Sequence, residues 1–210
     1  MGLAEQVGPA SWTLASDIEP TLRALGERGD IIKTMHRAMT GKGLNTDPAR
    51  LALHEDANGE RVIGRLVERG LHDELTGKAY AIVDGADGRI HHLRFPDLER
   101  TGDAAPGAIV ETSAWTDRKG RQQTSLLVRS DFTLERQIGA GGATWLDRQL
   151  VSPRLKTVSG GFGSEVREAL GKRADVLLEQ GLAKRQGQRI IYSRNLLGTL
   201  RERDLAAASD

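Results

Sequence analysis

Five short apolar or alternating runs most constrain what this chain can fold into. They lie at residues 62–67, 79–83, 89–95, 108–112 and 124–128. Runs of this length predict β-strands, and the Gly-, Asp- and Pro-rich segments between them predict tight connections. Short strands at this spacing are typical of a small barrel or a strongly curled antiparallel sheet of the OB or SH3-like kind. We therefore predict such a β-region over residues 61–130.

The segments on either side of this region nearly repeat each other. Residues 2–25 read "GLAEQVGPASWTLASDIEPTLRAL", and residues 181–203 read "GLAKRQGQRIIYSRNLLGTLRER". Each has Gly-Leu-Ala, a polar stretch with Gly, a few strand-like residues and then an apolar-periodic run that contains Thr-Leu-Arg. This pattern predicts a β-hairpin followed by a helix at both ends of the chain, related by duplication.

The N-terminal copy begins in the middle of such a module. Ser16 and Glu19 have the spacing of a capping box, which predicts a helix start, and Gly26 and Gly29 predict a break before a second helix. We predict a partial winged-helix-like unit over residues 1–40, a wing and following helices, whose opening helices would lie outside the chain. Residues 41–60 are rich in Gly, Asn, Asp and Pro, which predicts a linker.

The C-terminal copy has the elements that would precede it. A capped helix near Thr144, a longer helix from Ser164 and a hairpin that turns near Gly187 are predicted before the last helix. This order over residues 143–206 matches a winged-helix domain, in which one helix enters the major groove and other parts touch the DNA backbone. The predicted fold class is α+β, with winged-helix-like helical units that flank a small antiparallel β-barrel or curled sheet.

Basic residues gather in the C-terminal copy only. Residues 184–194 include four basic residues and no acidic residue, whereas residues 2–25 include one basic residue and three acidic ones. A basic cluster favours a phosphate backbone through counterion release. A solvated surface or a contact with a protein partner is the alternative. The residues that we predict to contact DNA are Arg167, Lys172, Arg173, Lys184, Arg185, Arg189 and Arg194.

Composition excludes several classes of protein. Lys and Arg number 30 against 29 Asp and Glu, so no strong global charge draws the chain to nucleic acid. The absence of Cys excludes disulfides, zinc–thiolate sites and a cysteine nucleophile. The chain has neither a secretory signal pattern nor an apolar run of the ~20 residues that a membrane helix needs. We therefore predict a cytoplasmic protein without membrane insertion.

Motifs for catalysis or metal binding are weak. His91 and His92 are neighbours on a predicted strand and would point to opposite faces, so they are poorly placed to share a metal. The run His72-Asp73-Glu74 has ligand-type side chains in a predicted loop, and an enzyme built on these histidines is a further hypothesis. The chain has no H-E-x-x-H motif and no complete phosphate-binding loop. We predict no catalytic residue, no metal and no cofactor.

Several segments resemble a known family. They are "LGERGDIIKTMHRAM", "GRLVERGLHDELTGKAYAIVDGADGRIHHL", "PGAIVE", "GATWLDRQLV", "GFGSEVREAL" and "RADVLLEQGLAKRQGQRIIYSRNLLGTLRERDL". In this order they resemble the region that follows the nuclease domain in bacterial relaxase/mobilization proteins of the TraI and VirD type. The resemblance covers nearly the whole chain.

The resemblance implies a role in DNA transfer. Relaxases of this type nick one DNA strand through a tyrosine and a His-x-His metal motif, and they pass through a type IV secretion channel during conjugation. This chain has no His-x-His cluster and no tyrosine in a matching context, so no catalytic residue is carried over. The resemblance implies a non-catalytic accessory region that binds DNA, with relaxosome or type IV secretion coupling proteins as further partners. As part of a relaxase it would reach the recipient cell. The alternative is a protein-interaction module, which would be a translocation signal or a relaxosome docking surface.

Overall fold

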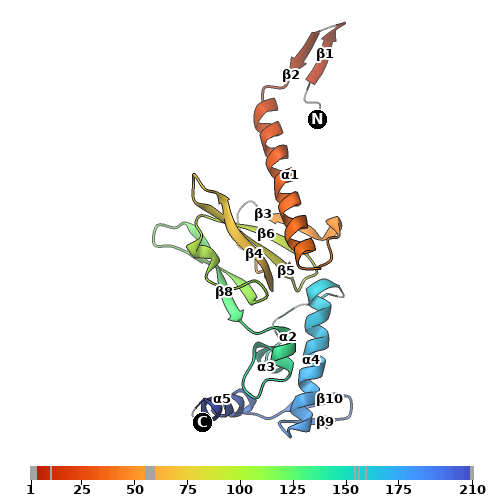
Figure 1. Cartoon of the computed structure of the whole chain (residues 1–210), viewed down its shortest axis with the longest axis vertical. Coiled ribbons are helices and arrows are strands. Elements are labelled where there is room, and N and C mark those ends of the chain that lie inside the picture. The colour runs from red at the N-terminus through yellow and green to blue at the C-terminus, as the bar shows by residue number, and fades with distance from the viewer. Residues whose placement is uncertain are drawn as a thin grey trace. The chain divides into compact units, whose positions relative to one another are not determined.

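The chain divides into two compact units, residues 1–46 and residues 47–210. The structure, a computed structural model, describes residues 4–9, 11–54, 60–153, 155, 157–158 and 160–208. The elements are α+β, and Figure 1 shows their order along the chain. Each unit is described by itself below.

The first unit contains a hairpin and one long helix. Strands β1 (Ala4–Gly8) and β2 (Ser11–Leu14) pair antiparallel, and α1 (Ile18–Gly41) follows. The predicted winged-helix-like unit with several helices is wrong, because Gly26 and Gly29 do not break α1. A glycine inside a helix costs only about 1 kcal/mol relative to alanine, and α1 tolerates this cost with the apolar residues Ile31, Met35, Ala38 and Met39 buried along its C-terminal half.

The second unit is built on a six-stranded mixed sheet. Its strands are β3 (Leu51–His54), β4 (Ile63–Asp73), β5 (Lys78–Gly85), β6 (Ile90–Phe95), β7 (Ile109–Thr116) and β8 (Gln122–Ser130). Their order across the sheet is β3-β6-β5-β4-β7-β8. Two short 3-10 helices, Pro48–Arg50 and Glu99–Thr101, lie beside the strands in sequence.

The predicted antiparallel barrel or curled sheet is wrong. The sheet is open, because β3 and β8 occupy its opposite edges, and it is mixed, because β3 runs parallel to β6. The five predicted strands are present, but the sixth comes from residues 51–54, in the segment that composition assigned to a linker. This additional strand extends the sheet beyond β6.

Two clusters of buried apolar side chains stabilise the sheet. One gathers residues such as Leu66, Val83 and Phe95 from neighbouring strands on one face. The other joins Ile63 and Ile109, at the end of the sheet, to the helices that follow it. Since the second cluster is continuous across both parts, the sheet orients the helices.

The helical part of the second unit follows β8. Its elements are α2 (Leu134–Ile138), α3 (Trp145–Val151), α4 (Gly161–Glu179), β9 (Ala183–Gln186), β10 (Arg189–Tyr192) and α5 (Leu196–Ala207). The capped helix predicted near Thr144 is confirmed, because Thr144 and Asp147 form a capping box at the start of α3. Helix α4 begins beside the sheet, where Arg65 of β4 binds Glu165, and ends at the hairpin β9–β10 (Figure 1).

Candidate nucleic-acid interface

Arg173 is not part of the surface. Its side chain is 0% exposed and forms a bidentate ion pair with the equally buried Asp147, with N–O distances of 2.8 and 3.0 Å. Its remaining donors bind the backbone carbonyls of Ile138, Ala140 and Gly142. The prediction that Arg173 contacts DNA is therefore wrong. Arg173 instead fixes the α2–α3 loop against α4.

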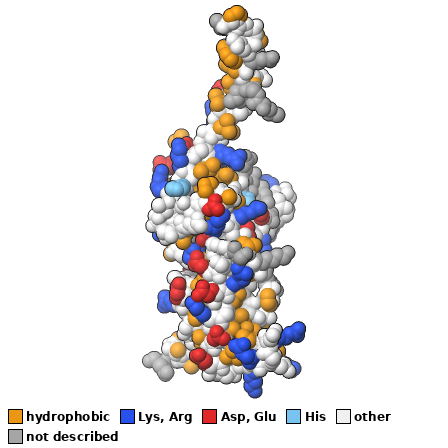
Figure 2. Space-filling model, turned by 90° about the vertical axis from the view of Figure 1, so that its right-hand side faces the viewer, with side chains coloured by type: hydrophobic (Ala, Val, Ile, Leu, Met, Phe, Trp, Pro, Cys, Tyr) orange, Lys and Arg blue, Asp and Glu red, His pale blue; other side chains and the backbone are white. Residues whose placement is uncertain are grey.

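The exposed face of α4 carries charges of both signs. Arg167 and Lys172 are exposed, as predicted, but four acidic residues lie on the same helix: Glu165, Glu168, Asp175 and Glu179. Lys172 is 2.6 Å from Glu168, and that hydrogen bond raises the pKa of Lys172 while it neutralises the charge locally. In Figure 2 acidic and basic side chains are interspersed along the lower part of the molecule. Helix α4 is therefore a poor surface for a polyanion.

The hairpin β9–β10 has two distinct faces. Residues that pair across an antiparallel ladder share a face, and successive residues alternate between faces. Ala183 pairs with Tyr192 and Arg185 with Ile190. These four residues form the inner face, because Ala183, Ile190 and Tyr192 pack with the apolar side chains of α4 and α5.

Arg185 lies on the inner face, near an acidic residue. Its guanidinium is 3.7 Å from the carboxylate of Asp175 on α4. Both side chains are more than half exposed, so this pair is worth at most about 1 kcal/mol. Arg185 is nevertheless less available to a phosphate than a cation without an acidic neighbour.

The outer hairpin face consists of Lys184, Gln186, Arg189 and Ile191. Lys184 pairs with Ile191 and Gln186 with Arg189 across the ladder. All four side chains are exposed, and Ile191 is 49% exposed although it is apolar. Within the described part of the chain no ion pair engages either Lys184 or Arg189. The face therefore presents two uncompensated cations.

The turn makes this face project. Gly187 has φ +59° at the first of the two turn residues, a conformation that favours glycine in two-residue hairpin loops. The turn predicted near Gly187 is thereby confirmed. Arg194 is exposed just beyond β10, and it too has no ion pair among the described residues. The basic end of the helical part thus consists of Lys184, Arg189 and Arg194, whereas Arg167 lies in the first half of α4, which begins beside the sheet.

The histidines form contacts that the sequence did not predict. His54 Nε2 is 2.9 Å from His91 Nδ1, and the two rings stack. Their outer nitrogens face Glu60 at 3.2 Å and Asp87 at 3.0 Å. Sequence reasoning missed this pair because it placed His54 in a linker, although the run Leu-Ala-Leu-His is strand-like. The arrangement is a pair of contacting imidazoles flanked by two carboxylates.

His92 is not part of the His54–His91 pair. Its ring stacks on Tyr80, and burial lowers the pKa of His92 to about 4. His72 meets the edge of the same ring, so it is separated from the His54–His91 pair. Among the residues that the structure describes, no group of three or more His, Asp or Glu side chains is placed to hold a metal ion.

Comparison with known proteins gives one match. A family model described as "Protein of unknown function (DUF3363)" matches residues 1–123 and 112–210. No curated protein and no solved structure matches the chain. Over the described ranges, every helix is too short or too polar to cross a membrane.

Proposed function

We propose that this chain, which belongs to the DUF3363 family of proteins of unknown function, binds DNA through the outer face of its hairpin β9–β10. The observation that carries the proposal is the pair of exposed cations, Lys184 and Arg189, on one face of a projecting hairpin. Both lack an ion pair within the described chain, so binding a phosphate costs them no existing contact.

The chemistry of the face suits a phosphate backbone. Each Lys or Arg that neutralises a phosphate releases condensed counterions, and this release supplies most of the affinity in non-specific binding. Ile191 lies on the same face, directly across the ladder from Lys184, and offers an apolar contact to sugars or base edges. Arg194 extends the basic end of the helical part and would add a phosphate contact.

Helix α4 does not read DNA bases in this proposal. Its four acidic residues would repel the phosphates that flank a groove, so we do not assign base reading to α4. Affinity then depends on backbone contacts and varies little with DNA sequence, since phosphate contacts position a protein without specifying bases.

The cellular context comes from the resemblance in sequence. The chain resembles the region after the nuclease domain of TraI- and VirD-type relaxases, so we propose a non-catalytic accessory role in conjugative or mobilization DNA transfer.

Fluorescence anisotropy with a labelled DNA duplex and the matching single strand tests the proposal. The double variant Lys184→Gln/Arg189→Gln should bind about 10-fold more weakly or worse, because two charge-assisted contacts are lost. The matched control is Arg118→Gln/Lys119→Gln, which removes the same charge from the exposed turn between β7 and β8. Equal affinity of the two double variants would reject the hairpin as the DNA contact.

Contact with a protein partner is a second function that one observation favours. The first unit exposes Trp12 by 61%, Leu22 by 52% and Leu25 by 56%. Large exposed apolar side chains in one segment are typical of surfaces that bind other proteins. A relaxosome or secretion coupling protein should then co-purify with the chain, and Trp12→Ser/Leu25→Ser should abolish this while the hairpin double variant retains it. Loss in neither variant would reject this second function.

A further inference from the structure

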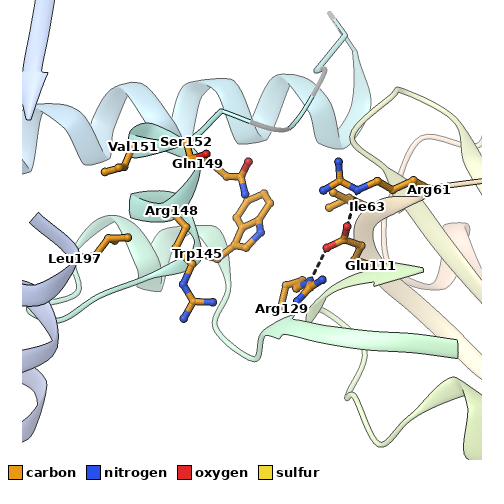
Figure 3. A pocket seen from close by; sticks show the side chains of 10 residues that line it. All are labelled: Arg61, Ile63, Glu111, Arg129, Trp145, Arg148, Gln149, Val151, Ser152 and Leu197. Atoms are coloured by element: carbon orange, nitrogen blue, oxygen red, sulfur yellow. Dashed lines mark hydrogen bonds and ion pairs between the residues drawn. The ribbon is translucent and has the colours of Figure 1, made fainter. Parts of the chain in front are cut away.

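A cavity of about 310 Å³ lies between the end of the sheet and helix α3. Figure 3 shows Arg61, Glu111 and Arg129 on the side of the sheet, opposite Trp145 and Gln149 of α3. Arg148 lines the same cavity farther along α3. The volume falls at the lower end of the range of roughly 300–1,000 Å³ that small-molecule sites occupy.

The cavity carries an excess of positive charge. Glu111 accepts hydrogen bonds from Arg61 at 2.6 Å and from Arg129 at 2.5 Å. Burial opposes the ionisation of Glu111, but these two guanidinium groups outweigh it and hold its pKa below the ordinary value. The ionised Glu111 is therefore shared by both arginines. Arg148 adds a further guanidinium, and no ion pair engages it among the described residues.

Gln149 supplies a second, independent signal. Its Oε1 atom is buried and has no hydrogen-bond partner. A buried acceptor without a donor costs free energy, so a site of this kind gains from a ligand that brings an N–H or O–H group. The ligand that fits must therefore be both an anion and a hydrogen-bond donor.

The apolar walls of the cavity indicate the part of the ligand that is not the anion. Trp145 and Leu197 give the cavity apolar surface between its polar groups, and the volume is about ten times the ~30 Å³ share of a water molecule. An inorganic anion alone would leave most of this space empty. A flat ring with amino or imino donors, joined to a phosphate, satisfies the apolar surface, the acceptor and the arginines together.

We propose that this cavity binds a nucleoside monophosphate, either free or as the terminal nucleotide of a DNA strand. The phosphate would lie toward the guanidinium groups, which match phosphate oxygens through paired N–H donors. The base would lie against the apolar wall and donate to Gln149 Oε1. This site shares no residue with the outer hairpin face, so it stands or falls independently of the proposed DNA contact.

Isothermal titration calorimetry of the whole chain tests the proposal with deoxyadenosine monophosphate. Deoxyadenosine lacks the phosphate, and inorganic phosphate lacks the base. Each should therefore bind at least about 10-fold more weakly than deoxyadenosine monophosphate. Arg148→Gln should weaken deoxyadenosine monophosphate by about 10-fold or more, whereas Arg118→Gln, an equal charge change on the exposed β7–β8 turn, should not.

Two results would overturn the inference. One is the absence of nucleotide binding at millimolar concentration, and the other is unchanged affinity in Arg148→Gln. A comparison of short oligonucleotides with and without a 5′-phosphate distinguishes the two sources of ligand. A preference for the phosphorylated end identifies a strand terminus, and binding of the free nucleotide alone identifies a metabolite. The Lys184→Gln/Arg189→Gln variant should bind the mononucleotide normally, which separates this site from the hairpin.

Discussion

At the scale of single residues, buried ionisable groups decide most of what this chain tolerates. Arg173 and Asp147 are both fully buried, and every nitrogen of the guanidinium has a partner. From the sequence alone, Asp147 is only the N3 residue of a capping box that starts at Thr144. Its second role, as the partner of an arginine that lies 26 positions away, depends on how α4 packs on α3. Because this packing cannot be read from the sequence, sequence reasoning predicted that Arg173 contacts DNA.

Removal of the Arg173 guanidinium should destabilise the fold strongly. Arg173→Met leaves Asp147 charged and buried without its partner, and the free energy of unfolding should fall by about 3–5 kcal/mol. Arg167→Met, on the exposed side of the same helix, should change it by no more than about 0.5 kcal/mol. Urea unfolding followed by circular dichroism measures both. Similar stabilities for the two variants would mean that the buried pair contributes little.

His92 should make stability depend on pH. Burial lowers its pKa in the folded state to about 4, whereas the unfolded chain titrates near 6.5. As the pH falls below 6.5, the unfolded state takes up a proton that the folded state binds only near pH 4. The stability present above pH 6.5 is therefore lost between these values, by about 2–3 kcal/mol at pH 4.5.

The variant His92→Phe isolates this effect from other titrating groups. It should lose the part of the pH dependence that belongs to His92, so the stability of the wild type relative to the variant should decline from pH 7.5 to pH 4.5. Urea midpoints at a series of pH values provide the measurement. Parallel pH profiles for the two proteins would show that His92 is protonated equally in both states.

At the scale of elements, the sequence predicted local structure better than pairing. The five central strands, the capped α3, the long α4 and the C-terminal hairpin follow from periodicity and turn residues. Strand β3 does not, because its four residues follow a Gly- and Pro-rich segment and it pairs in parallel with β6, far along the chain. The His54–His91 contact and the mixed character of the sheet depend on this one non-local pairing.

The outer hairpin face could have been derived from the sequence alone. Once residues 183–186 and 189–192 are assigned to the strands of a hairpin with a two-residue turn, strict alternation of side chains places Lys184 and Arg189 on one face and Arg185 on the other. The cavity beside α3 could not, since its arginines come from the segment just before β4, from β8 and from α3. No periodicity in sequence brings Arg61, Arg129 and Arg148 together.

Two glycines of α4 should respond oppositely to the same substitution. A Cβ atom at Gly163 would overlap the carbonyl oxygen of Ala86 and lie 2.9 Å from that of Val158, whereas a Cβ atom at Gly171 meets nothing within 4 Å. Gly163→Ala should therefore lower stability by about 1–3 kcal/mol. Gly171→Ala should raise it by about 0.5–1 kcal/mol, because alanine restricts the unfolded chain.

Thermal unfolding of the two alanine variants provides this comparison. Their melting temperatures should lie on opposite sides of the wild-type value. A shift of the same sign in both would show that α4 does not approach the β5–β6 turn as closely as its backbone contacts indicate.

At the scale of the whole molecule, function must be local, because the charges nearly cancel. With 30 basic and 29 acidic side chains, the chain has a formal net charge of +1 and no overall attraction to DNA. Any affinity for DNA must therefore come from a few cations that no acidic residue compensates. The outer hairpin face with Arg194 is such a set, whereas α4 is not.

The salt dependence of DNA binding tests this account most directly. If the three cations Lys184, Arg189 and Arg194 contact phosphates, log Kd should vary with log salt concentration with a slope of about 2.7, at about 0.9 for each phosphate neutralised. Lys184→Gln/Arg189→Gln should reduce this slope by about 1.8, and Arg118→Gln/Lys119→Gln should leave it unchanged. A slope that both variants share with the wild type, or one that only the β7–β8 turn variant reduces, would contradict DNA binding by the hairpin.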